Sequence, residues 1–192
     1  MIITSIKSNI SRADAVAKFR DRLNELRHGR LRIVTDFYIP YRFFRMNQTG
    51  AFLAADAVTG KLDLIQFDRL PQEEGRMIVD TAMVAEERIK EEEAYKLVRE
   101  SMTRSIFMKG FFKLRRVNLE IELAASLHIP YWIGVYERND HARLEIINGL
   151  QGGLQGGLQG GLQGRFEGAK MREIVAEWFQ PRQTEGLLKC SQ

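Results

Sequence analysis

His128-Ile-Pro-Tyr-Trp-Ile-Gly-Val-Tyr-Glu-Arg-Asn-Asp-His-Ala-Arg-Leu-Glu-Ile-Ile-Asn-Gly-Leu-Gln-Gly152 is the stretch that decides the fold. It predicts a β-hairpin, because two apolar and aromatic runs flank a polar turn at Arg138–His141. About ninety residues upstream, Ile39-Pro40-Tyr41 repeats the tripeptide Ile129-Pro130-Tyr131. The order helix, alternating strand, Ile-Pro-Tyr strand, turn and second strand occurs around both tripeptides, which indicates two related units.

We therefore predict an α+β protein with antiparallel sheets and flanking helices. Residues 1–75 would form the first helix-plus-strands unit. Residues 76–180 would form the second unit with a C-terminal helix, and residues 181–192 a tail. The connections between Arg30 and Phe67 are short. Antiparallel strands are expected there, because a parallel crossover needs about a dozen residues or more.

Apolar residues at helical spacing predict three helices. The first, Arg12–His28, follows the capping sequence Ser11-Arg-Ala-Asp14 and would bury Leu23 and Leu26. The second would run from Thr81 to Met108, after a surface loop at residues 70–75. The third would run from Glu167 to Phe179 and end before a proline.

Residues 149–164 repeat Gly-Leu-Gln-Gly four times. A helix is not expected here, since eight interior glycines would cost on the order of 8 kcal/mol relative to alanine. We interpret the array as a tandem expansion of one native tetrapeptide, with three copies dispensable for the fold. The alternative that stays open is a recognition strand that pairs between chains.

The composition limits the classes of function. The chain has 192 residues, with 29 basic and 25 acidic residues and a net charge of +4. This balance allows mild attraction to anionic partners but is not the excess of a nucleic-acid binder. The sequence shows neither a long apolar run nor a signal-peptide pattern, so we expect a cytoplasmic protein without a transmembrane segment. The single cysteine, Cys190, excludes an intramolecular disulfide.

Motifs for catalysis, cofactors or metals are not apparent. His28, His128, His141 and Cys190 share no metal-ligand spacing. The glycines form no phosphate-binding loop, and no nucleophile stands beside a recognisable base. We therefore expect no metal and no cofactor and name no catalytic residue. An enzyme whose site is assembled beyond the view of sequence stays an alternative.

The segment from Arg104 to Arg116 mixes basic and aromatic residues. Its candidate binding residues are Arg104, Lys109, Phe111, Phe112, Lys113, Arg115 and Arg116. Such a segment can bind nucleic acid or an anionic membrane surface, or present aromatic rings to a protein partner. In the competing interpretation the phenylalanines enter the core while the basic groups extend into solvent.

A second candidate binding pair lies on the hairpin. Trp132 and Tyr136 flank Gly134 on one face, and Ile133 and Val135 lie on the other. Either the sheet is buried on both faces or these aromatics are presented to a partner. We expect burial, because the predicted helices must cover something; an exposed Trp132 would mark an interface.

Residues 11–67 combine a helix, antiparallel strands and the turn Asp56-Ala-Val-Thr-Gly60-Lys61. This stretch resembles the PepSY family of small α/β modules, whose units contain a similar Asp-Ala-x-Thr-Gly-Lys turn. The resemblance implies a helix-plus-sheet module and a role in binding or inhibiting peptidases.

These observations together predict a non-enzymatic protein- or peptide-binding or adaptor protein that can also associate with itself as a homo-oligomer. The first alternative is a binder of nucleic acid or of an anionic membrane surface through residues 104–116. The second alternative is an enzyme.

Overall fold

The fold is built from seven strands and three α-helices in the described part of the chain. The computed structural model describes residues 1–46, 52–63, 70–108, 120–138, 141–150 and 175. The strands are β1 (Ile2–Ile6), β2 (Arg30–Met46), β3 (Phe52–Asp56), β4 (Leu62–Asp63), β5 (Arg76–Asp80), β6 (Ile121–Arg138) and β7 (His141–Asn148). The helices are α1 (Arg12–Phe19), α2 (Arg22–His28) and α3 (Glu91–Met108), with a short 3-10 helix η1 at Glu73–Gly75.

The sheet is mixed. Its strands lie in the order β4-β3-β2-β6-β1-β5, and β7 pairs with β6. The pairs β1–β5, β2–β3, β3–β4 and β6–β7 are antiparallel. β1 runs parallel to β6, with Ser5 opposite His128. The α+β class is confirmed, and the parallel β1–β6 pair corrects the expectation of purely antiparallel sheets.

The described residues form two compact units. Unit 1 consists of Met1–Ile6 and Ile39–Ile129, and unit 2 consists of Lys7–Tyr38 and the described residues from Pro130 onward. Each unit therefore draws on both of the stretches, 1–75 and 76–180, that the sequence analysis treats separately.

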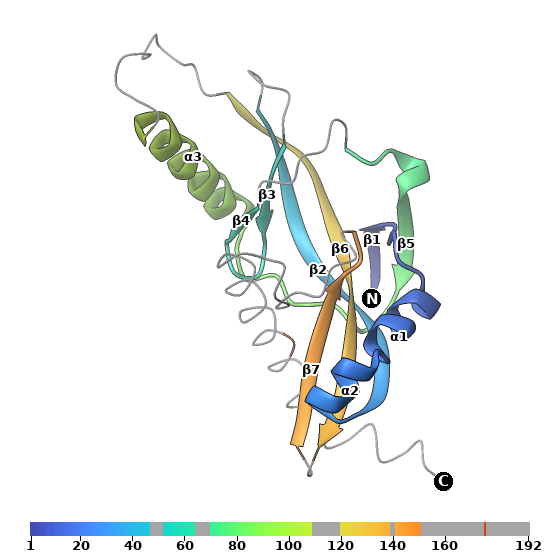
Figure 1. Ribbon diagram of the computed structural model, residues 1–192. Coiled ribbons are helices and arrows are strands. Elements are labelled where there is room, and N and C mark those ends of the chain that lie inside the picture. Colours follow the sequence, from blue (N-terminus) through green and yellow to red (C-terminus); the bar gives the residue numbers. More distant parts are fainter. Residues whose placement is uncertain (47–51, 64–69, 109–119, 139–140, 151–174, 176–192) are drawn as a thin grey trace. The chain divides into compact units, whose positions relative to one another are not determined.

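Unit 1 packs α3 against the β2–β3 hairpin (Figure 1). One buried cluster joins Ala94 and Val98 of α3 to strand residues Phe44, Leu53, Ala55 and Ile121. The acidic first turn of α3, Glu91–Glu93, suits the positive end of the helix dipole. Gly60 has a φ of 71°, and a Cβ there would lie 2.9 Å from Cδ1 of Leu97. A side chain at position 60 would therefore strain the backbone and displace the Leu97 side chain where this turn approaches α3.

Unit 2 packs α1 against the β6–β7 hairpin (Figure 1). Its buried cluster consists of Ile10, Ala15, Phe19, Tyr136 and Ile147. The N-terminus of α1 has the predicted capping box: Ser11 Oγ accepts from the Asp14 amide, and Asp14 Oδ2 accepts from the Ser11 amide. The Ser11 hydroxyl also donates to Asp14 Oδ2 at 2.7 Å. This bond, together with the one from the Ser11 amide, holds the pKa of the Asp14 carboxyl below its usual value.

The predicted hairpin at residues 128–152 is confirmed over its described part. Arg138 pairs with His141 next to the turn, and Tyr131 pairs with Asn148 at the far end. β7 ends at Asn148, and residues 149 and 150 form a turn. The rest of the Gly-Leu-Gln-Gly array lies outside the described residues, as do the predicted turn at 47–50 and the tail.

The two Ile-Pro-Tyr tripeptides occupy similar places in their hairpins. Tyr41 lies opposite Asp56, and the Pro40 carbonyl accepts a hydrogen bond from the Ala57 amide at 2.9 Å. Likewise, Tyr131 lies opposite Asn148, and the Pro130 carbonyl accepts from the Gly149 amide at 2.9 Å. The likeness is local to the hairpin ends, and a duplication of whole units stays a prediction.

The side chain opposite each tyrosine closes the turn that follows it. Asp56 Oδ1 accepts from the Val58 amide at 2.7 Å, and Asp56 Oδ2 accepts from the Thr59 hydroxyl at 2.7 Å. In the second hairpin Asn148 Oδ1 accepts from the Leu150 amide at 2.8 Å. Both are Asx turns, in which a short polar side chain binds a backbone amide two residues ahead.

The prediction of one helix over Arg12–His28 is wrong. Asp21 has an extended ψ of 133°, so the helix ends and a new one begins there. The Asn24 side chain donates to the Lys18 carbonyl at 3.0 Å and satisfies an acceptor at the end of α1. The break changes the helical phase, and Leu23 and Leu26, expected in the core, are 71% and 68% exposed.

The prediction of a helix over Thr81–Met108 is wrong in its first ten residues. The amides of Arg88 and Ile89 both donate to the Ala57 carbonyl, at 2.9 and 2.8 Å. The Arg42 guanidinium donates to the Ile89 carbonyl. These bonds take the backbone groups that a helix would use, so α3 begins only at Glu91. In the predicted third helix only Val175 is described, and it is helical and buried.

Asp56 provides a test of the turn chemistry. Asp56→Ala should lower the free energy of unfolding by about 2–3 kcal/mol, because the buried Val58 amide loses its acceptor. Asp56→Asn should cost about 1 kcal/mol or less, since an amide oxygen can still accept, as Asn148 does. Urea unfolding measures both values.

The control is Asp14→Ala, which removes an exposed capping carboxylate and should cost less than Asp56→Ala. Equal losses for the alanine variants at positions 56 and 14 would show that the buried turn is not a special source of stability.

Candidate functional site

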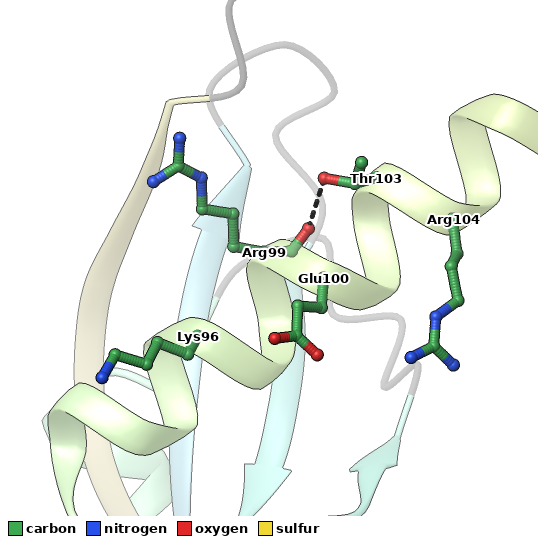
Figure 2. Close-up of a pocket in the computed structure, with 5 residues that line it drawn as sticks. All are labelled: Lys96, Arg99, Glu100, Thr103 and Arg104. Atoms are coloured by element: carbon green, nitrogen blue, oxygen red, sulfur yellow. Dashed lines mark hydrogen bonds between the residues drawn. The ribbon is translucent and has the colours of Figure 1, made fainter.

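The basic candidate surface lies on α3. Lys96, Arg99, Glu100, Thr103 and Arg104 line an open groove of about 490 Å³ (Figure 2). The spacing of these positions places them along one side of the helix. From this face the side chains diverge: in Figure 2 Lys96 and Arg99 extend to the left of the view and Arg104 to the lower right, with the Glu100 carboxylate between them. The three cations do not converge on one point, so the arrangement fits an extended polyanion better than a small anion.

Of the predicted basic and aromatic residues, the structure places only Arg104. It is exposed and lines the groove. Lys109, Phe111, Phe112, Lys113, Arg115 and Arg116 lie outside the described residues. Lys96 and Arg99 belong to the same surface but precede the predicted segment. The i, i+3 spacing of Lys96 and Arg99 indicates in the sequence that the two side chains share one face of a helix.

The aromatic pair on the hairpin belongs to the core of unit 2, as the burial interpretation expects. The Tyr136 side chain is fully buried, and its hydroxyl donates to the Phe19 carbonyl at 2.6 Å. Burial raises the pKa of this hydroxyl. Trp132 is half-buried, packs against the same cluster, and donates through Nε1 to the Ile10 carbonyl at 3.2 Å.

Gly134 explains why the aromatic face is covered. A Cβ at this position would lie 2.7 Å from Cδ1 of Phe19, so the ring of Phe19 occupies the space that a side chain would need. The hollow between Trp132 and Tyr136 thus receives a side chain of this chain, from α1. The structure does not bring these two aromatics together with Arg104 in one unit.

Sequence reasoning missed the β1–β5 pair. The sequence prediction places no element at residues 76–80, between the loop at 70–75 and the helix expected from Thr81, and no strand in the first ten residues. The two strands pair over five residues, from Ile2 opposite Asp80 to Ile6 opposite Arg76. The signal was present in Met77-Ile78-Val79, a short run with β-branched residues between two charges.

β5 is the last strand at its side of the sheet in the described part of the chain (Figure 1). The Thr81 amide donates to the Met1 carbonyl at 3.0 Å, so these two residues form a hydrogen-bonded pair at the end of the β1–β5 ladder. Hydrogen-bonded and non-hydrogen-bonded pairs alternate along an antiparallel ladder, so Val79 and Met77 also belong to hydrogen-bonded pairs. Residues in hydrogen-bonded pairs face the partner strand, and the residues between them direct their N–H and C=O groups away from it. Met77 and Val79 therefore face β1, and Arg76, Ile78 and Asp80 direct their backbone groups to the outer edge. At this edge the Arg76 amide already donates to the Glu73 carbonyl.

Exposed apolar side chains accompany this edge. Ile78 is 78% exposed and Ile2, on the neighbouring strand, is 73% exposed. The alternation places both on the same face of the strand pair, since Ile78 lies opposite Thr4 and Ile2 lies two residues before Thr4. The opposite face carries Ile3 and Ser5, which are buried. One face of the pair thus packs inward, while the other presents isoleucines beside an unpaired strand edge.

The histidines have structural contacts. In unit 2, His28 Nε2 lies 3.4 Å from Glu145 Oε1, and the ring lies 5.6 Å from the ring of Tyr136. In unit 1, His128 Nδ1 lies 3.1 Å from the Thr4 carbonyl, and the Ser5 hydroxyl donates to the His128 carbonyl at 3.0 Å. Burial lowers the pKa of the His128 imidazole, and the Thr4 carbonyl and Glu87 act in the opposite direction.

Among the described residues, no group of three or more histidines, cysteines or acidic residues could hold a metal ion. None of the helices in this part of the chain is long and apolar enough to cross a membrane.

Comparisons with known proteins give no relative of this chain: no protein-family model, no curated protein and no solved structure matches it. The resemblance of residues 11–67 to the PepSY family therefore stays a prediction.

His128 gives the fold a pH dependence. Because its pKa is lowered from 6.5 in the folded chain, the unfolded chain binds more protons between the two pKa values. The contribution of the neutral imidazole is present above about pH 6.5 and is lost as the pH falls towards the folded pKa. The free-energy difference between wild type and His128→Gln should therefore shrink from about pH 7.5 to about pH 5.

Urea unfolding across this pH range measures the difference. Subtracting the His128→Gln variant removes the contributions of the other titrating groups, which both proteins share. If the free-energy difference between wild type and His128→Gln stays constant or grows on acidification, the pKa of His128 is not lowered in the folded chain.

Proposed function

We propose that the protein is a non-enzymatic binding protein or adaptor that captures an extended segment of a protein partner by strand addition at β5. The observation that carries this proposal is the outer edge of β5, which has no partner strand in the described part of the chain and presents the C=O of Arg76 and the N–H and C=O groups of Ile78 and Asp80. A strand that docks there adds main-chain hydrogen bonds, and alternate side chains give specificity.

The chemistry of β5 supports capture of a protein segment. Natural proteins commonly protect edge strands with proline, bulges or central charges. β5 has none of these in its centre: Ile78 is flanked by Met77 and Val79, and the charges stand only at its ends, Arg76 and Asp80. A matching segment would place an apolar residue opposite Ile78 and charges of opposite sign at its ends.

The exposed isoleucines extend the surface beyond the strand edge. Ile2 and Ile78 lie on the outer face of the β1–β5 pair, next to Thr4. Contact with these side chains removes apolar surface from water, which favours association. The resemblance of residues 11–67 to PepSY modules points to the same class of function, which is protein binding.

Strand addition can be tested with a displayed library of random linear peptides. Peptides selected on the wild-type chain should lose at least about tenfold in affinity for Ile78→Pro, because proline removes the central outward N–H without removing a bond to β1. Hydrogen exchange should show slower exchange of the Ile78 and Asp80 amides in the peptide complex.

The matched control is Leu26→Lys, which changes an equally exposed apolar residue on α2. Selected peptides that bind Ile78→Pro as well as wild type, or that leave the β5 amides unchanged, would refute strand addition.

A second candidate function is binding of an extended polyanion by α3, and the groove in Figure 2 favours it. Lys96, Arg99 and Arg104 are exposed and spread along the helix, as contacts with successive phosphates or sulfates require. Glu100 between them weakens the local positive potential. This surface includes Arg104, the first residue of the basic and aromatic segment 104–116 that is expected to bind nucleic acid or an anionic membrane surface.

Replacing Lys96, Arg99 and Arg104 by glutamine should lower the salt concentration at which the protein elutes from heparin. The matched control replaces the exposed residues Lys7, Arg12 and Arg30 by glutamine, which gives the same net charge. Equal elution of the two triple variants would assign the retention to overall charge and remove α3 as a specific surface.

A further inference from the structure

We propose that the strand that β5 receives is β5 of a second copy of this chain, in an antiparallel pair with its two-fold axis at Ile78. This inference rests on the strand-addition function and names the partner. It follows from the sequence of the strand, Arg76-Met77-Ile78-Val79-Asp80, which is complementary to itself when it is reversed.

Backbone geometry allows only one full register. The residues of β5 that face outward are Arg76, Ile78 and Asp80, and antiparallel hydrogen-bonded pairs must join members of this set. The Arg76 amide already donates to the Glu73 carbonyl, so Arg76 contributes only its C=O, while Ile78 and Asp80 contribute both groups. Centring on Ile78 pairs Arg76 with Asp80 of the second copy, Ile78 with Ile78, and Asp80 with Arg76. Any shifted register loses at least one of these pairs.

Charge complementarity selects the antiparallel direction. In the centred pair each Arg76 faces Asp80 of the other copy, which places opposite charges at both ends of the interface. A parallel pair in register would place arginine against arginine and aspartate against aspartate. The two Ile78 side chains, each 78% exposed in the single chain, would meet at the axis and be removed from water.

The existing contacts of the two charged residues leave room for this pairing. Arg76 Nε donates to the Pro71 carbonyl at 2.7 Å, and the two terminal guanidinium nitrogens can bind the carboxylate. Asp80 Oδ1 lies 3.1 Å from the N-terminal ammonium, and both groups are highly exposed. Such an exposed ion pair contributes little to stability. It leaves the second carboxylate oxygen of Asp80 available to bind Arg76 of the second copy.

The size of the interface sets the expected affinity. Five residues of one strand on each side, with Ile2 beside them, bury less than a standard protein interface, so a weak dimer is expected. Its dissociation constant should lie in the range of about 1 µM to 1 mM. Sedimentation equilibrium over a concentration series measures it on the full chain.

Charge reversal tests the pairing directly. Arg76→Asp and Asp80→Arg should each weaken the homodimer at least about tenfold, because like charges then face each other at both ends. An equimolar mixture of the two variants should form a heterodimer, since each end then joins an arginine to an aspartate. Arg12→Asp, which reverses an exposed charge on α1, is the control and should leave the dimer unchanged.

The double variant R76D/D80R gives a second test that does not depend on the single variants being folded. It should form a homodimer as strong as wild type but should not pair with wild type. A dimer that ignores these changes, or a double variant that stays monomeric, would overturn the two-fold β5 pair.

Different results would reject strand addition at β5 and the choice of a second copy as its partner. A wild-type chain that stays monomeric at about 1 mM overturns the second copy as partner. Strand addition would still stand if peptides protect the Ile78 amide. Peptides that fail to protect this amide, together with a monomeric chain, would remove both.

Discussion

The hairpins depend on a hydrogen bond that proline can still make. Proline has no N–H, so within a strand it contributes only its carbonyl to the ladder. Pro40 and Pro130 use that carbonyl in the same way: each accepts from the amide that follows the end of the partner strand. The residue before that amide, Asp56 or Asn148, then binds the amide two positions ahead and turns the chain. The end of each hairpin is thus fixed by one backbone acceptor and one short polar side chain.

The same geometry in the first hairpin determines where α3 begins. It places the Ala57 carbonyl where it accepts from the amides of residues 88 and 89, so these amides are not available to a helix and α3 starts after them.

This dependence explains which parts of the fold the sequence predicts. The hairpin at residues 128–148 is visible because its turn, alternating side chains and partner strand all lie within one short stretch. The capping box of α1 is visible for the same reason, since Ser11 and Asp14 satisfy each other locally. The break at Asp21 is harder to foresee, because apolar residues continue at helical spacing through Leu26 and only the backbone at Asp21 departs from the helix.

The parts that could not be predicted are those formed between distant short segments. β1 and β5 are five residues each, and each is stabilised by a partner about seventy-five residues away, so neither has a local signature beyond a few apolar residues. Sequence also cannot show whether a strand is central or at an edge, because that depends on the order of the whole sheet. The same limit applies to the aromatic pair on the hairpin. Trp132 and Tyr136 are equally apolar whether they face a partner or α1, and only the contact between Gly134 and Phe19 decides in favour of the core.

An open edge such as β5 raises the question of why association would stop at two chains. Growth into a fibre needs a second edge that can act as a template on the same molecule. At the opposite end of the sheet order lies β4, Leu62–Asp63, within the described residues. A two-fold pair through Ile78 uses β5 of both copies at once, so the dimer has no equivalent edge left. The end charges add selectivity, because Arg76 and Asp80 are satisfied only by an antiparallel partner in one register. The features that favour association in β5 therefore also limit it to a closed pair.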